Sequence, residues 1–297
     1  MLITTANLKL LNQGFNAAFK QGWDSVAPTW QQVAMDIPST TDAENYGWLE
    51  QIPGMREWIG QRVIHNLKTT GVQVRNRDWE HTLGVDVNAV EDDKFGTFSL
   101  AFKMQGEVVR SHPDGLVWGL LPDGFATLGL DGQYFFDTDH VGYNIAKAEV
   151  AYSNMQAGSG NPWFLLDLSR SFMKPLALQM RKEPQYVQLN QPNDQMVFME
   201  KKILYGADAR YTAFYGFHQL AFGSKATLDV TNYEAARAAM GSQYKPDGSK
   251  LPVRPTHLVV GQSNEGAARR VLAERIANGA DNIWSKSVEL IVCPWLP

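Results

Sequence analysis

Cysteine is almost absent from this sequence, which has one, Cys293, among 297 residues. A single cysteine excludes an intrachain disulfide and any zinc site built from several thiolates. Its neighbours in the sequence are apolar, so we expect a buried, inert thiol in a protein made in a reducing cytoplasm. No apolar run approaches the roughly 20 residues that a membrane-spanning helix needs. The first residues lack the basic start and apolar stretch of a signal peptide, so none is expected.

A large excess of one charge is also lacking, because 27 lysine and arginine residues face 31 aspartate and glutamate residues, for a net charge of −4. Tight, sequence-independent binding to nucleic acid needs clustered basic residues, so this composition disfavours it. Aromatic residues, in contrast, are plentiful, with 9 Trp, 10 Tyr and 14 Phe. The length suits one large domain or two medium ones, and the aromatic residues favour extensive packing within or between chains.

The N-terminal part of the sequence combines a helix with an irregular arm. Apolar residues at spacings of three and four predict a helix over 5–22. From 23 to 54, prolines and polar clusters interrupt the periodicity, which predicts an extended segment. Trp23 and Trp30 in this arm must still be covered, either by a neighbouring subunit or by the arm's own domain.

Residues 57–78 predict two β-rich arms joined by a turn at 69–71, where glycine supplies a positive φ. Neither arm has a cleanly apolar face, so the hairpin should rest on another subunit or on a domain surface. The candidates for contacts between subunits are Arg62, His65, Lys68, Arg75 and Arg77 on the hairpin, together with Trp23 and Trp30 on the arm. A nucleic-acid patch is the weaker interpretation, since acidic residues dilute the positive charge.

A strand and a long helix are expected next. Alternating apolar and polar residues over 79–87 predict a half-buried strand, with His81 as a core histidine. The helix is expected over about 93–111, with the acidic residues at 91–93 on its positive end. Pro113 should end or kink this helix before a short second one.

The rest of the sequence alternates between predicted strands and helices. Strand-like pieces fill 172–223, and 211–218 is apolar on both faces, which is typical of a central strand. The C-terminal third is predicted to be α/β. One of its helices opens with a capping box from Thr231 to Glu234, and a second is capped by Ser263 or Asn264.

The stretch DGQYFFDTDH at 131–140 is the strongest candidate for chemistry, because it holds three carboxylates and a histidine. A metal-dependent hydrolase centred on Asp131 to His140 is the alternative function. A catalytic metal needs converging ligands, whereas the alternation directs Asp137, Asp139 and His140 apart, and no His-x-x-x-His or Glu-x-x-His companion exists. The aromatic residues favour a packed turn with aspartate caps. We therefore predict no metal, no cofactor and no catalytic residue here.

Several motifs in one order give the sequence a resemblance to a known family. They are YGWLEQIPGMREWIGQRVIHNL, VNAVEDDKFGTFS, DGQYFFDTDH, FLLDLSR, QMVFMEKKILYGADARYTAFYGFHQLAF and a C-terminal series that begins LDVTNYEAARAAMGSQ. Together they cover nearly the whole chain, which resembles the major head subunit family of Mu-like phages and prophages. The resemblance implies a major capsid protein with an α+β, Hong Kong 97-type fold.

The resemblance also implies the parts of that fold. They are an N-terminal arm over 1–53, an extended hairpin loop over 54–87, a mainly peripheral domain with the spine helix over 88–227, and a mainly axial α/β domain over 228–297. The order of elements looks permuted relative to the prototype, because the strands around 196–222 precede the strand-helix module of the axial domain. The prototype joins subunits through a loop lysine, but no matching motif assigns that role to Lys68.

The function implied by the resemblance involves no catalysis. The subunit is expected to form the pentamers and hexamers of an icosahedral head shell, synthesised in the bacterial cytoplasm and found in the virion. A portal, a scaffold and a maturation protease are the implied partners. Packaged double-stranded DNA is expected to be enclosed without sequence-specific recognition, and no membrane is involved.

Overall fold

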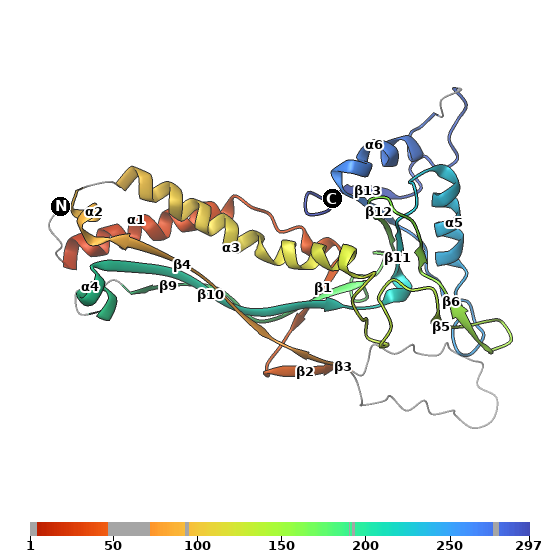
Figure 1. Ribbon diagram of the computed structural model, residues 1–297, viewed down its shortest axis with the longest axis horizontal. Helices are drawn as coiled ribbons and strands as arrows, with labels where there is room; N and C mark the ends of the chain where they lie inside the picture. The colour runs from red at the N-terminus through yellow and green to blue at the C-terminus, as the bar shows by residue number, and fades with distance from the viewer. Residues whose placement is uncertain (1–4, 47–71, 93–94, 190, 192–193, 276–278) are drawn as a thin grey trace.

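The structure, a computed structural model, describes residues 5–46, 72–92, 95–189, 191, 194–275 and 279–297. Figure 1 shows an elongated molecule with a long part and, at one end, a broader part. In the long part, helices α1 and α3 run along strands β4, β9 and β10, whereas the broader part holds α5, α6 and a second sheet. Within these described ranges, no helix is long and apolar enough to cross a membrane.

The long part is built on a four-stranded sheet in the order β1-β9-β10-β4. Its strands are β1 (Ala34–Pro38), β4 (Arg77–Asp86), β9 (Leu176–Leu189) and β10 (Lys202–Tyr215). β10 lies between β4 and β9 and pairs antiparallel with both. The predicted central strand is therefore confirmed, although it ends at Tyr215 rather than at residue 218.

Two helices, α1 (Thr5–Asp24) and α3 (Phe95–Asp123), pack against each other along this sheet. Phe15 of α1 stacks on Phe102 of α3 with ring centroids 4.3 Å apart. Both rings meet Tyr205 of β10 edge-on. This aromatic packing explains the apolar spacing that predicted a helix over 5–22, which α1 confirms.

Helix α3 is longer than predicted, because proline does not end it. It runs through Pro113 as a single helix of 29 residues. Val117, Trp118 and Leu121 lie beyond the proline and are all buried. Burying three large apolar side chains stabilises the helix by more than the backbone hydrogen bond that Pro113 cannot make.

The broader part is built on a five-stranded sheet in the order β13-β12-β8-β11-β7. Its strands are β7 (Met155–Gln156), β8 (Trp163–Leu166), β11 (Ala221–Ser224), β12 (His257–Val260) and β13 (Glu289–Val292). Helices α5 (Val230–Gly241) and α6 (Gln262–Val271) accompany them. Because β8 lies at the centre of the sheet, this part of the molecule crosses the predicted boundary at residue 228 and draws on two separate stretches of the chain.

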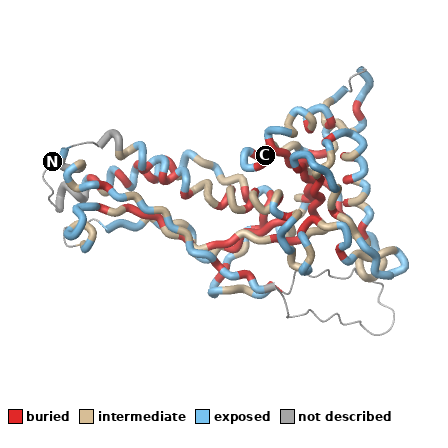
Figure 2. The backbone as a smooth tube through the Cα atoms, viewed as in Figure 1, coloured by how far each residue is buried: buried red, intermediate tan, exposed pale blue. Residues whose placement is uncertain are grey.

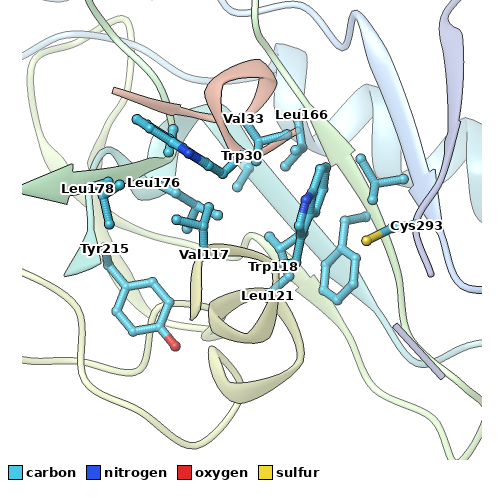
Figure 3. Close-up of a cluster of buried hydrophobic side chains, with 14 of the residues drawn as sticks. Trp30, Val33, Val117, Trp118, Leu121, Leu166, Leu176, Leu178, Tyr215 and Cys293 are labelled. Atoms are coloured by element: carbon cyan, nitrogen blue, oxygen red, sulfur yellow. The ribbon is translucent and has the colours of Figure 1, made fainter. Parts of the chain in front are cut away.

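The largest buried cluster lies where the two parts meet (Figure 2). It joins Trp30 of the 3-10 turn η1 (Trp30–Gln32), Trp118 of α3, Leu166 of β8 and Leu178 of β9 (Figure 3). Cys293 belongs to the same cluster, and burial raises the pKa of its thiol to about 11. The predicted burial of this cysteine is confirmed, and the two sheets share one core.

The segment predicted as a hairpin over 57–78 pairs differently where the structure describes it. Residues 57–71, with the predicted turn, lie outside the described residues. β3 (Val72–Arg75) pairs antiparallel with β2 (Ala43–Tyr46), and β4 follows directly. The second predicted arm therefore has a strand partner in the N-terminal arm, which supplies the backbone hydrogen bonds that its sequence alone did not reveal.

Several local predictions are wrong. The first half of the strand-like piece predicted at MVFMEKKILYG belongs to the helix α4 (Gln195–Glu200), and only its second half belongs to β10. The first turn of α3 has no acidic residue, because α2 (Val87–Glu91) comes between β4 and that helix and Glu91 is the last residue of α2. Helix α5 is capped by Asp229 instead of Thr231, and α6 begins after Gly261 without a side-chain cap from Ser263 or Asn264. Several residues near each helix start can act as caps, so sequence alone does not single one out.

Candidate functional site

The stretch 131–140 forms a packed turn between α3 and the hairpin of β5 (His140–Tyr143) and β6 (Glu149–Tyr152). Phe135 and Phe136 are almost fully buried in the core between the two parts. Asp131 and Asp137 each accept a hydrogen bond from the backbone N–H of a following residue, at 3.2 and 2.7 Å. The predicted packed turn with aspartate caps is confirmed.

The three carboxylates of this turn do not converge. Asp139 is exposed and Asp137 caps the backbone, whereas Asp131 Oδ2 lies 2.6 Å from Nδ1 of His140. A second histidine, His218 of the 3-10 turn η3 (His218–Leu220), places its Nδ1 3.6 Å from the same oxygen. The two imidazole rings are stacked, with centroids 4.0 Å apart and 7° between their planes. The turn thus holds a His-Asp-His cluster.

The sequence interpretation missed His218 as part of this cluster. It placed the residue in a central strand, whereas β10 ends at Tyr215 and the chain then turns into η3. The available signal was a polar ring inside the apolar stretch GFHQLAFG, because a buried imidazole needs a hydrogen-bond partner. Nothing in the sequence named that partner.

Burial and the contacts among the three side chains set the protonation of the cluster. Burial would raise the pKa of the Asp131 carboxyl, but the hydrogen bond with His140 and the nearby His218 lower it below the usual value. Burial, and next the neighbouring His140, lower the pKa of His218 to about 3. At neutral pH, therefore, the cluster holds an ionised carboxylate and a neutral His218.

The residues predicted to contact other subunits fall in different environments. Arg62, His65 and Lys68 lie outside the described residues. Trp30 is only 5% exposed and packs in the chain's own core, so its own domain covers it. Trp23 is half-buried at the end of α1 and lies over the guanidinium of Arg110.

Arg75 and Arg77 are exposed at the junction of β3 and β4. Nearby Arg210 is paired within the chain, with Asp42 at 2.6 Å and Asp78 at 3.2 Å. Between described residues, by contrast, no ion pair involves Arg75 or Arg77. Their guanidinium groups remain open to a carboxylate outside this part of the chain.

Large apolar side chains are exposed on helices α3 and α4 of the long part. Leu100, Met104 and Val108 follow at intervals of four along α3, on one face, and are 62, 58 and 50% exposed. Phe198 and Met199 of α4 are 80 and 69% exposed at the far end of β9 and β10. Gathered apolar side chains of this kind mark surfaces that contact other proteins.

The identity of the chain follows from a comparison with known families. The family described as "Mu-like prophage major head subunit gpT" matches residues 8–296. The chain belongs to the Mu-like major head subunit family. This head subunit is 34% identical over 306 residues to the "Major capsid protein" of Escherichia phage Mu, with 100% of both chains covered. It is 36% identical over 288 residues to the "Mu-like prophage FluMu major head subunit" of Haemophilus influenzae, covering 95% of this chain and 93% of that one.

Solved capsid structures show the same fold. The head subunit is similar to a chain in the "Procapsid of bacteriophage JBD30", with a TM-score of 0.84, 39% identity, and coverage of 99% of this chain and 100% of that chain. For the "Bacteriophage JBD30 capsid" the TM-score is 0.78 and the identity 32%, with 92% of each chain covered. The predicted α+β, Hong Kong 97-type capsid fold is confirmed.

These similarities also establish what the head subunit does. It is the major capsid protein of a phage head and assembles with copies of itself into the icosahedral shell of the virion. Its family is one of structural proteins, so the prediction that it is not an enzyme is confirmed. No observation supports the alternative of a metal-dependent hydrolase, and the cluster at 131–140 belongs to a shell protein.

Proposed function

We propose that the long part of the head subunit is the peripheral domain and the broader part the axial domain, and that subunits form pentamers and hexamers around the axial domains. The peripheral domain consists of α1, α3 and the four-stranded sheet. The axial domain consists of residues 124–171 and 216–297, around the five-stranded sheet. The separate strand orders of the two sheets, each with its own helices, support this division.

In the proposed shell, the N-terminal arm over 1–53 and the extended loop over 54–87 reach across neighbouring subunits. β2 from the arm and β3 from the loop pair in a two-stranded sheet of their own. This small sheet projects from the side of the long part (Figure 1). Many modest contacts of this kind, made at once, stabilise a closed shell far more than any one of them.

The proposal includes the other components of head assembly. A scaffold and a maturation protease act on the growing shell, a portal occupies one opening, and double-stranded DNA is packaged inside. The net charge of −4 supports containment of DNA rather than tight binding, because a surface without a basic excess releases few counterions from DNA.

The main observation in support of the proposed contacts between subunits is the exposed apolar stripe of Leu100, Met104 and Val108. The opposite side of α3 packs on α1 and on the sheet, and the described part of the chain leaves the stripe largely exposed. Each such side chain stabilises a contact by about 1.5–3 kcal/mol when it is fully buried. Repeated in every subunit, this stabilisation favours the shell over free subunits.

Replacing Leu100 and Met104 together by serine should reduce the yield of shells at least about tenfold, because a loss of about 1.4 kcal/mol per contact already changes an equilibrium tenfold. The melting temperature of the unassembled subunit should stay unchanged, since both side chains are mostly in water. Glu107→Ser changes an exposed polar residue on the same helix and should assemble normally. Sedimentation measures the particle yield, and a double variant with the wild-type yield contradicts the proposed contact.

Arg75→Glu should block shell formation while the isolated subunit keeps its melting temperature. At an interface an arginine fork binds a carboxylate through two hydrogen bonds, whereas an exposed ion pair contributes only about 0–1 kcal/mol. The proposed partner is an acidic residue of another subunit, and Arg62 and Arg77 are the other candidates on the loop.

The matched control for this charge reversal is Arg75→Lys, which keeps the charge, loses the fork and should assemble partly. Particle counts by electron microscopy compare the variants. Normal shells from a triple Arg62, Arg75 and Arg77 to Glu variant would show that none of the three arginines binds a neighbour's carboxylate.

A further inference from the structure

The His-Asp-His cluster lies where the chain crosses from one sheet to the other. β10 belongs to the four-stranded sheet and β11 to the five-stranded sheet, and His218 lies in η3 between them. His140 is the first residue of β5, and Asp131 lies in the turn after α3. The cluster thus ties three separate segments together at the junction of the two sheets.

The contacts within the cluster are close and shielded from water. Asp131 Oδ2 faces Nδ1 of His140 at 2.6 Å and Nδ1 of His218 at 3.6 Å. The side chain of His140 is 0% exposed, that of His218 13% and that of Asp131 30%. Asp131 is therefore the one member with substantial access to solvent. The Asp131 carboxylate therefore lies next to two imidazole rings at once.

The geometry does not suit a metal ion. The lone pair of an imidazole nitrogen lies in the plane of its ring, and these two planes are 7° from parallel with centroids 4.0 Å apart. One ion therefore cannot lie in both planes without separating the rings. A histidine that binds a metal through one nitrogen also donates its other N–H to an acceptor. Within the described residues, Nε2 of both His140 and His218 is buried without a hydrogen-bond partner.

We propose that Asp131, His140 and His218 form a proton-sensitive joint between the two sheets, closed while His218 is neutral and opened when His218 takes up a proton. In the closed joint, Nδ1–H of His140 donates to the carboxylate and Nε2 of His218 carries no proton. Protonation of Nε2 creates a buried N–H donor without an acceptor, which is costly. It also places a positive charge against the ring of His140.

The surroundings offer little to balance a positive charge on His218. Asp131 is the carboxylate in contact with both rings, and Asp137 of the same turn is engaged with the backbone N–H of Thr138. From β6, Tyr152 lies opposite His140 in the strand register, and burial raises the pKa of its hydroxyl, which stays neutral. A proton on His218 would therefore be balanced mainly by a carboxylate that is 3.6 Å away and already hydrogen-bonded to His140.

The direction of the pH effect follows from the burial of His218. A histidine in the open joint has a pKa of about 6.5, whereas the closed joint keeps His218 neutral to much lower pH. The open form therefore binds more protons below about pH 6.5, and the closed form is fully favoured above that pH. Each unit of pH below about 6.5 should raise the ratio of open to closed joint about tenfold.

Amide hydrogen exchange of the full chain, corrected for the intrinsic effect of pH, tests the joint. Protection of residues 128–143 and 216–224 should fall about 50-fold between pH 6.5 and 4.5, because the histidine of the open joint is already half protonated at pH 6.5 and the ratio then approaches a tenfold change per unit. Protection of α1, which lies along the long part in Figure 1 and packs on α3, should change much less. In His218→Gln, which cannot take up the proton, the fall in the two joint segments should disappear.

Two comparisons make the result decisive. His257→Gln is the matched control, because His257 lies on β12, 3.2 Å from Glu289, and this variant should keep the wild-type response. Equimolar Zn²⁺ should give no protection that depends on His218. The proposal is wrong if His218→Gln keeps the wild-type response, or if zinc protects both segments in the wild type but not in His218→Gln.

The wild-type protein gives a second measurement that does not depend on a foldable variant. With histidine labelled at the ring carbon, the His218 resonance should keep its neutral shift while the joint segments remain protected. A His218 resonance that titrates near pH 6.5 with both segments still protected would overturn the proposal.

Discussion

Gly106→Ala is expected to lower the free energy of unfolding of the unassembled head subunit by about 2–3 kcal/mol. Gly106 lies on α3 at a point where α1 passes close to it. A Cβ at this position would lie 2.1 Å from the carbonyl oxygen of Phe19 and 2.8 Å from the backbone nitrogen of Trp23. Backbone atoms cannot rotate away as a side chain can, so the two helices must separate. That separation disturbs the stacking of Phe15 on Phe102.

The same helix provides a matched control for this substitution. A Cβ on Gly119 of α3 meets no atom within 4 Å. Gly119→Ala should therefore stabilise the subunit by up to about 1 kcal/mol, because alanine favours a helix over glycine by that amount. Urea unfolding of both variants measures the difference. Equal stability of Gly106→Ala and Gly119→Ala would show that the close approach of the helices does not constrain the fold.

Trp118→Ala should destabilise the head subunit by about 3–5 kcal/mol, the cost of removing a large buried aromatic side chain. Trp118 is 1% exposed in the core that joins the two sheets, and its Nε1 donates to Thr29 Oγ1 at 2.9 Å. The substitution leaves a cavity at the junction and removes the donor to this hydroxyl. The loss should appear as a lower urea midpoint with little change in slope.

Two further variants separate the causes of this loss. Trp118→Phe keeps most of the volume and loses the hydrogen bond, so it should cost about 1 kcal/mol for that bond in addition to a small packing term. Phe198→Ala removes an aromatic side chain that is 80% exposed and should change the stability by less than about 0.5 kcal/mol. If Trp118→Ala were as stable as Phe198→Ala, the shared core could not be what holds the two sheets together.

Much of the fold could be predicted from local patterns in the sequence. Helix α1 and strand β4 have periodic apolar residues, and both form where the pattern predicts them. The apolar stretch at 211–218 likewise predicted a central strand, although β10 ends at Tyr215. Patterns failed where contacts distant in sequence decide the outcome. Burial of Val117, Trp118 and Leu121 carries α3 through Pro113, and pairing with β2 determines the partner of β3.

In the candidate site, too, local features could be predicted from the sequence and contacts between distant residues could not. The turn at 131–140 was predictable, because its aspartate caps and buried phenylalanines act within ten residues. The cluster with His218 was not, because η3 reaches Asp131 only through the crossing from β10 to β11. Trp30 packs in a core with residues of α3 and β9, which are distant in the sequence. The residues around Trp30 therefore left open whether its own domain or a neighbouring subunit covers it.

Electron microscopy of the purified head subunit tests the central claim most directly. A major capsid protein that assembles with copies of itself should give closed shells, or rings of five and six subunits, whose particles contain this chain. The shells should be lost in the Arg75→Glu variant even though its subunit stays folded. A uniform population of single folded subunits, at every concentration and in the presence of the other head-assembly proteins, would contradict the account.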